Sequence, residues 1–227
     1  MTGIFDSGVG GLAAYFELRR LLPREDIIYL ADRKNAPYGT KTKDELIALT
    51  KKDIKRLCDM GARQVLIACC TASTVYSELS EWERKISTPI ITPASRVAAE
   101  GERIAVIATE HTVRSGAFGK EIRKFSQASE VFERAEQPLV AMVESGSRDG
   151  RISGECEGEI RQIAEWVRDI RADTLVLGCT HFSHLELTLR EMLPCVKIVS
   201  PAREGARAIK EKITVQNATG NGREIYI

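Results

Sequence analysis

Short apolar runs alternate with longer amphipathic stretches along the 227 residues of this chain. The runs are rich in Val, Ile and Leu, which is typical of strands buried on both faces of a parallel sheet. The intervening stretches follow the helical period, and Thr42-Lys43-Asp44-Glu45 has the form of a capping box. The alternation predicts an α/β fold of three layers, with mainly parallel sheets and helices on both faces. The predicted strands are Gly3–Asp6, Ile27–Leu30, Gln64–Ala68, Pro89–Thr92, Arg103–Ala108, Glu130–Arg134, Thr174–Gly178, Val196–Ser200 and Arg223–Ile227.

Two of these segments form a faint internal repeat. Ala62 to Cys69 and Ala172 to Cys179 both run Ala, polar, polar, three aliphatic residues, a small residue and Cys. Solenoid repeats recur at shorter periods, so this repeat favours two similar α/β halves. We expect one domain to comprise residues 1–94 and 200–227 and the other to comprise 95–199, with the break near 93–101.

Composition narrows the class of protein. A hydrophobic content of 43% and a charged content of 29% are ordinary for a soluble globular protein. The net charge of +1, without any basic run, argues against a nucleic-acid partner. No apolar stretch reaches the roughly 18 residues of a membrane span, and no signal peptide precedes the first strand. The expected location is therefore the cytoplasm, with no membrane partner.

The six cysteines carry the candidate chemistry. In the cytoplasm they should be thiols, and because they contain no CxxC pair we expect no structural zinc. Cys69 and Cys179 each end a predicted strand, where ligands of parallel sheets bind, so facing halves would place both thiols across one cleft. Backbone amides and a helix dipole there favour the thiolate, which predicts a pKa below about 8.5. Other cysteines are expected only to pack, namely Cys58, Cys156 and Cys195.

Polar residues near these cysteines complete the predicted cleft. His181 follows Cys179 by two residues and is expected to handle protons there. Cys70 is either a second reactive thiol or a small polar substitute. The turn Ala36–Gly39 is expected to form a rim that offers backbone amides and the phenol of Tyr38.

The N-terminal glycines allow two interpretations. Gly8-Val9-Gly10 with Ala13 satisfies the loose dinucleotide pattern, with Asp32 as the acid that would bind a ribose. Asp6 and Ser7, however, stand before the first glycine, where a pyrophosphate would meet a carboxylate. The favoured alternative is that Asp6 and Ser7 face the cleft while the glycines allow close backbone approach.

Taken together, the motifs resemble those of the bacterial glutamate racemases, in the aspartate/glutamate racemase superfamily. The resemblance covers essentially the whole chain in the correct order. The motifs that carry it are Phe5-Asp6-Ser7-Gly8-Val9-Gly10-Gly11-Leu12, Pro37-Tyr38-Gly39, Ala68-Cys69-x-Thr71-Ala72-Ser73, Pro138-Leu139-Val140 with Val143-Glu144-x-Gly146, and Gly178-Cys179-Thr180-His181-Phe182.

The resemblance implies racemisation of L- and D-glutamate without any cofactor or metal, supplying D-glutamate for peptidoglycan, in a cleft between two domains of a possible homodimer. By motif match, Cys69 would act on the α-proton of the D-enantiomer, assisted by Asp6. Cys179 would act on that of the L-enantiomer, assisted by His181, with Glu144 as an acid nearby. The residues expected to hold the substrate are Asp6, Ser7, Tyr38, Gly39, Cys70, Thr71, Thr180 and His181.

One departure keeps other functions open. The family motif after the first cysteine is Asn-Thr, whereas this chain has Cys70-Thr71, and a thiol cannot replace the donors and acceptor of an amide. A superfamily relative acting on another small acid, such as an aspartate racemase or an isomerase, is therefore the main alternative. A nicotinamide-dependent oxidoreductase and a non-catalytic binding protein are the others.

Overall fold

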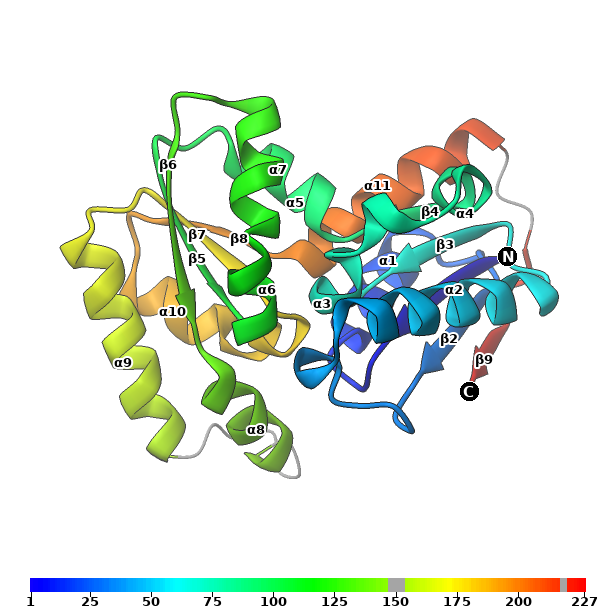
Figure 1. Cartoon of the computed structure of the whole chain (residues 1–227), viewed down its shortest axis with the longest axis horizontal. Coiled ribbons are helices and arrows are strands. Elements are labelled where there is room, and N and C mark those ends of the chain that lie inside the picture. The colour runs from blue at the N-terminus through cyan, green and yellow to red at the C-terminus, as the bar shows by residue number, and fades with distance from the viewer. Residues whose placement is uncertain (147–153, 217–219) are drawn as a thin grey trace.

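Two parallel sheets form the framework of the protein (Figure 1). The computed structural model describes residues 1–146, 154–216 and 220–227, with the backbone alone at 143–146, 154–156 and 214–216. The first sheet has the strand order β4-β3-β1-β2-β9, and the second has the order β6-β5-β7-β8. Neighbouring strands pair in parallel throughout both sheets, which confirms the predicted α/β class.

Each predicted strand has a counterpart in the structure. In β1 and β7 every residue is buried, as expected for strands that helices cover on both faces. The strands are β1 (Thr2–Asp6), β2 (Ile27–Ala31), β3 (Gln64–Ile67), β4 (Ser87–Pro89), β5 (Arg103–Ala108), β6 (Glu130–Ala135), β7 (Thr174–Gly178), β8 (Lys197–Val199) and β9 (Glu224–Tyr226).

Helices connect these strands. The capping box predicted at Thr42 is confirmed: the Glu45 amide donates to the Thr42 hydroxyl, and the Thr42 amide donates to the Glu45 carboxylate. Within the described ranges, no helix is long and apolar enough to cross a membrane. The α-helices are α1 (Leu12–Leu21), α2 (Lys43–Asp59), α3 (Cys70–Ser73), α4 (Glu81–Ile86), α5 (Ile91–Ala98), α6 (Glu110–Ser115), α7 (Ala117–Phe125), α8 (Gln137–Gly146), α9 (Gly154–Asp169), α10 (Glu186–Met192) and α11 (Pro201–Gln216). The 3-10 helices are η1 (Tyr38–Thr40), η2 (Tyr76–Glu78) and η3 (Thr180–Leu185).

Each sheet buries one face against helices of its own. In the first sheet, Phe5 and Ile67 pack with Leu46 and Ile54 of α2. In the second sheet, β5 and β7 pack in the same way against α9, η3 and α10, in a cluster that includes Ala105, Ile107, Leu175, Leu177, Ile160, Ile163, Leu185 and Leu189.

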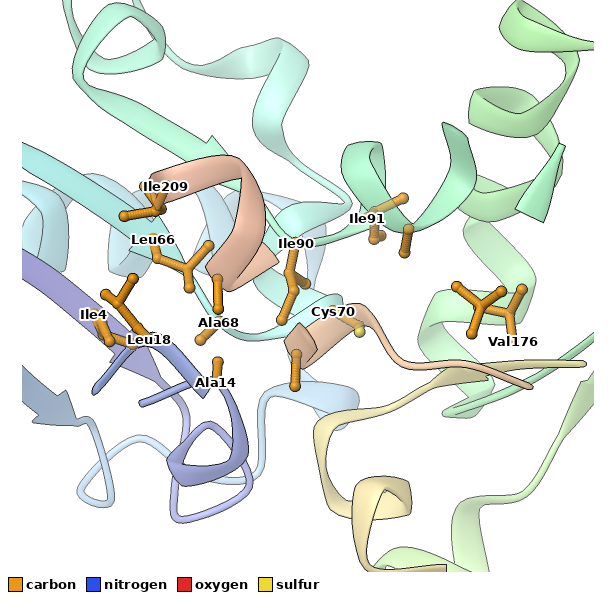
Figure 2. Close-up of a cluster of buried hydrophobic side chains, with 14 of the residues drawn as sticks. Ile4, Ala14, Leu18, Leu66, Ala68, Cys70, Ile90, Ile91, Val176 and Ile209 are labelled. Carbon is orange, nitrogen blue, oxygen red and sulfur yellow. The ribbon is translucent and has the colours of Figure 1, made fainter. Parts of the chain in front are cut away.

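The opposite faces share one apolar cluster that runs from sheet to sheet. It begins with Ile4 and Leu66 of the first sheet, which pack against α1 and α11 (Figure 2). It continues through Ile90 and Ile91 to Val176 of the second sheet. The shared cluster therefore ties the two sheets together beneath the ends of β3 and β7.

The strand predicted at Pro89–Thr92 is wrong in its position. The ladder ends where Pro89 pairs with Ile67: the Ile90 amide donates to the Ile67 carbonyl as its last bond and also to the Ser73 hydroxyl. Helix α5 then starts at Ile91. Pro93 is tolerated there because it lies in the first turn, where a backbone amide would have no partner within the helix. The apolar run extended over the strand end and the helix start, which hydrophobicity alone cannot separate. The expected break near 93–101 thus contains a helix.

Removing one buried side chain of the shared cluster should test its contribution to stability. Leu66 is fully buried in β3, so Leu66→Ala should lower the free energy of unfolding by about 2–5 kcal/mol. Urea denaturation of wild type and variant measures the difference. The control is Leu187→Ala, since the Leu187 side chain is 72% exposed and its loss should change stability by less than about 0.5 kcal/mol. Equal effects of both substitutions would contradict the packing described above.

Candidate active site

Cys69 and Cys179 lie in the wall of the same small cavity. Cys69 follows β3 and Cys179 follows β7, so each thiol stands at the carboxyl end of a strand in a different sheet. The cavity has a volume of about 50 Å³, which is room for a few water molecules and less than an amino acid needs. Its walls come from both halves: Ser7, Gly8, Ala36, Pro37, Tyr38, Gly39, Cys69, Cys70, Thr71, Thr109, Gln137, Val140, Cys179, Thr180 and His181.

Short hydrogen-bonded segments hold the first thiol in place. The Ala72 amide donates to Cys69 Sγ at 3.4 Å, and the Cys69 thiol donates to Ser7 Oγ at 3.7 Å. Next to it, a cluster of hydroxyls joins the two halves, with Thr71 Oγ1 3.3 Å from Thr109 Oγ1. The base of the cavity is therefore built by α3 on one side and the start of α6 on the other.

The second thiol lies beside a histidine. Nδ1 of His181 is 3.6 Å from Cys179 Sγ, and the two side chains are only 6% and 5% exposed. The predicted pairing of His181 with Cys179 is present in the geometry. Between them in the chain, the Thr180 hydroxyl donates across the cleft to Asp6 Oδ1 at 3.4 Å.

Asp6 lies behind the cavity wall. It is completely buried at the end of β1, and its Oδ2 accepts the Gly8 amide at 2.9 Å. Burial raises the pKa of the Asp6 carboxyl, against the opposing effects of His181 and the nearby amides. Its charge acts on both thiols, because it raises the pKa of Cys69 and of Cys179 alike.

The predicted lowering of the thiol pKa values is wrong. Burial raises the pKa of Cys69 to about 12 and raises that of Cys179 well above its usual range. The amide of Ala72 and Ser7 oppose the shift at Cys69, but desolvation of the thiolate outweighs them. The helices that follow are also short: α3 has four residues and η3 is a 3-10 helix of six, so neither supplies the dipole of a long helix.

The predicted rim is present, but the phenol of Tyr38 is directed elsewhere. Tyr38 lines the cavity, yet its hydroxyl lies 2.7 Å from Asp32 Oδ2 and 2.9 Å from Asp53 Oδ2. The rim therefore offers the cavity its backbone and ring rather than a free hydroxyl. Gly39 faces the second half, where an added Cβ would meet Gln137 at 3.4 Å.

Other predicted residues have mixed outcomes. Cys70 lines the cavity and also belongs to the shared apolar cluster of Figure 2. Cys58 is half-buried, but Cys195 is exposed, so the expectation that it packs is wrong. The side chains of Glu144 and Cys156 lie outside the described residues.

Three residues of the cavity wall were not expected in the site from the sequence, although one of them, Val140, belongs to a motif of the resemblance. Thr109 directly follows β5, so the rule that located the cysteines at strand ends would also have found it. Gln137 and Val140 lie on α8, and no strand-end signal marks them.

The residues around the cavity bear on whether the site could bind a metal ion or a dinucleotide. Among residues 1–146, 154–216 and 220–227, no group of three His, Cys, Asp or Glu side chains could hold a metal ion. In this arrangement the side chains of Thr180 and His181 lie against Gly10, where the dinucleotide pattern would place a pyrophosphate. A larger cavity of about 680 Å³ lies between β4, α5 and α11, away from both thiols and without Cys or His in its wall.

Comparisons with known proteins identify relatives of this chain. The Asp/Glu/hydantoin racemase family matches residues 17–209. A glutamate racemase from Desulforudis audaxviator (strain MP104C) is 37% identical over 217 residues, which are 92% of this chain and 77% of that protein. The chain belongs to the Asp/Glu/hydantoin racemase family.

Solved structures of racemases share this fold. Glutamate racemase from Francisella tularensis subsp. tularensis SCHU S4, in complex with D-glutamate, superposes with a TM-score of 0.88 at 28% identity, covering 99% of this chain and 86% of that one. Escherichia coli glutamate racemase, in complex with L-glutamate and the activator UDP-MurNAc-ala, has a TM-score of 0.74 at 27% identity, over 96% and 84% of the chains. The two-sheet architecture is thus that of this racemase family.

The packing around Gly10 leaves no room for a side chain at this position. An added Cβ would lie 2.5 Å from Thr180 Oγ1 and 2.9 Å from His181 Nδ1, so Gly10→Ala should displace these residues. We expect a loss of up to roughly a hundredfold in kcat/KM for racemisation, because small misplacements at a catalytic site are costly. Gly158→Ala is the control, since nothing lies within 4 Å of its added Cβ. Unchanged activity of Gly10→Ala would show that the contact is not needed.

The raised thiol pKa values predict selective alkylation. With iodoacetamide near neutral pH, Cys195 should react before Cys69 and Cys179 because it is exposed, while those two should react slowly as buried neutral thiols. Labelling of Cys69 should increase as the pH is raised towards its pKa of about 12. Peptide mass spectrometry over a time course measures each site. Faster labelling of Cys69 than of Cys195 near neutral pH would mean that its pKa is depressed.

Proposed function

We propose that this protein interconverts L- and D-glutamate with two thiol bases, Cys69 and Cys179, and without a cofactor. The observation that carries the proposal is that two buried thiols, one from each sheet, lie in the wall of one cavity. A racemase must remove a proton from one face of the α-carbon and return a proton to the other face. Two opposed groups that alternate as thiolate and thiol perform both steps.

The polar neighbours give each thiol its own proton partner in this proposal. His181 Nδ1, at 3.6 Å, takes the proton of Cys179 and leaves a thiolate beside an imidazolium. Asp6 does the same for Cys69: when Asp6 accepts a proton, the negative charge that disfavours the Cys69 thiolate disappears. Cys69 then abstracts the α-proton of D-glutamate and Cys179 that of L-glutamate, as the resemblance implies. Glu144 remains proposed as an acid near Cys179.

Substrate enters by separation of the two halves in this proposal. The cavity of about 50 Å³ is smaller than glutamate, so the closed arrangement must open and then close around the substrate. Polar contacts across the cleft, such as Thr180 to Asp6 and Thr71 to Thr109, are those that would break and reform. Closure expels water, which strengthens the interaction of fixed donors with the carbanionic transition state.

The substrate would be held by residues of both halves. The proposed contacts are the cavity-lining residues Ser7, Tyr38, Gly39, Cys70, Thr71, Thr180 and His181, with Asp6 behind them. We also propose domains at 1–94 with 200–227 and at 95–199, supported by sheet membership. The first boundary falls within α5 and the second immediately before α11. A homodimer, a cytoplasmic location and a role in supplying D-glutamate for peptidoglycan rest on the family resemblance.

Cys70 favours a second candidate substrate. Its thiol forms part of the cavity wall and of the apolar cluster, so position 70 contributes none of an amide's hydrogen-bonding groups. A shorter acid such as aspartate is therefore the alternative, and every assay below should include D-aspartate beside D-glutamate.

Isotope exchange in heavy water should test the two-base assignment. Wild type should place deuterium at the α-carbon of the product enantiomer, from either enantiomer of glutamate. Cys69→Ser should lose exchange from D-glutamate, and Cys179→Ser should lose exchange from L-glutamate, each by roughly a thousandfold because serine is a far weaker base. Mass spectrometry and circular dichroism follow label and chirality.

Cys58→Ser provides the matched control for these variants. Cys58 lies on α2, outside the cavity wall, so its substitution should leave exchange intact. Full activity of either cavity variant would overturn the assignment. Absence of exchange by wild type with glutamate, together with exchange of aspartate, would favour the second candidate.

A further inference from the structure

Three oxygen atoms meet beneath the rim of the cavity in an arrangement that racemisation itself does not require. The hydroxyl of Tyr38 lies 2.7 Å from Asp32 Oδ2 and 2.9 Å from Asp53 Oδ2. Asp53 is 1% exposed and belongs to the buried face of α2, among Leu46, Ile54 and Leu57. A carboxyl group in an apolar helix face needs a hydrogen-bonded partner, and here that partner is Tyr38.

Proton counting limits the charge of this cluster. A phenol has one proton, so Tyr38 can donate to only one of the two carboxyl groups. Burial and the nearby Asp53 raise the pKa of Tyr38, so this proton stays on the phenol. The second short contact therefore needs a proton on one of the two carboxyl groups. If both were carboxylates, one of them would face the Tyr38 oxygen with no hydrogen atom between the two oxygens.

The neighbours decide which acid holds that proton. The amide nitrogen of Asn35 donates to both carboxyl oxygens of Asp32, at 2.9 Å and 2.8 Å. Two accepting oxygens suit the anionic form of Asp32. Burial first, and then the charge of Asp32, raise the pKa of Asp53 to about 6. The Tyr38 hydrogen bond and the charges of Lys52 and Arg56 oppose this shift.

The cluster supports the part of the first half that meets the second half. Ala36, Pro37, Tyr38 and Gly39 all line the cavity. The Asp32 amide also donates to the carbonyl of Asp6 at 2.9 Å, so the cluster is joined to the buried acid behind the thiols. Displacement of the Tyr38 ring would therefore move a wall of the cavity.

We propose that Asp53 is a positioning residue of this site: its protonated carboxyl donates to Tyr38, whose hydroxyl donates to the Asp32 carboxylate, and this relay holds the Ala36–Gly39 wall in place. The kinetic consequences rest on the proposed function, whereas the protonation of Asp53 does not. Because the folded-state pKa of Asp53 is raised, the stabilisation is present at low pH and is lost as the pH rises through about 6. Ionised Asp53 then leaves two carboxylates competing for one hydroxyl, and the wall loosens.

The test compares wild type with Asp53→Asn, whose amide can donate to Tyr38 at every pH. The ratio of the wild-type KM to the variant KM for glutamate should rise by roughly fivefold as the pH is raised through about 6, while the ratio of kcat values changes little. Ionisations of the substrate and of the thiols are common to both proteins and cancel in these ratios. A flat KM ratio would overturn the proposal.

Asp59→Asn is the matched control. Asp59 lies on the same helix, is 61% exposed and pairs with Lys55, so removing its charge should leave the wild-type pH profile unchanged. In a Tyr38→Phe background the relay is absent, and Asp53→Asn should then have no further effect on the profile. An effect of the same size in both backgrounds would mean that Asp53 acts without Tyr38.

Infrared spectroscopy provides a readout that is independent of activity. The difference between the spectra of wild type and Asp53→Asn, both with carbon-13-labelled aspartate, should show the C=O stretch of one buried protonated carboxyl below about pH 6 that is lost at higher pH. Any band from the buried Asp6 is common to both proteins and cancels in this difference. Absence from the wild-type spectrum of any carboxyl band that titrates near pH 6 would overturn the proposal even if the variant fails to fold. A titrating band in a protein that does not racemise glutamate would contradict the proposed function and leave the relay intact.

Discussion

One apolar cluster runs from Ile4 and Leu66 in the first sheet, through Ile90 and Ile91, to Val176 in the second. Because it is continuous, the two sheets cannot be placed independently, and the carboxyl ends of β3 and β7 face a common cavity. This packing places the thiols of Cys69 and Cys179 in the wall of the same cavity. Helices α5 and α11, which carry the chain between the sheets, contribute to the same cluster, so the connections are themselves part of the core (Figure 1).

Burial has an electrostatic consequence for every ionisable group in this region. Cys69, Cys179 and Asp6 are all withdrawn from water, and the pKa of each is raised. A resting site of neutral thiols avoids the cost of isolated charges in a region of low dielectric constant. In the proposed mechanism, reactivity depends on proton exchange with an adjacent group, and His181 lies beside Cys179 where such an exchange could occur.

Much of the framework could be predicted from the chain, because buried strands and amphipathic helices differ in period. The strand ends at Cys69 and Cys179 followed from this pattern, and so did the capping box at Thr42. The strand predicted at Pro89–Thr92 was misplaced because one apolar run spans a strand end and a helix start. The thiol pKa values were predicted with the wrong sign, because a sequence shows which amides are near a cysteine but not how much water surrounds it.

The sequence by itself determined the parallel α/β class, the paired cysteines and the motifs of a racemase family, since these depend on local period and residue identity. Tertiary structure decided which residues from distant parts of the chain come into contact around these motifs. Only folding brings Asp53, from the buried face of α2, to the hydroxyl of Tyr38, and brings Gln137 of α8 to the wall that Cys69 shares. Neither contact leaves a local pattern, because a partner distant in sequence is chosen by the packing of whole helices and sheets, and that packing also sets the desolvation on which the charge of each group depends.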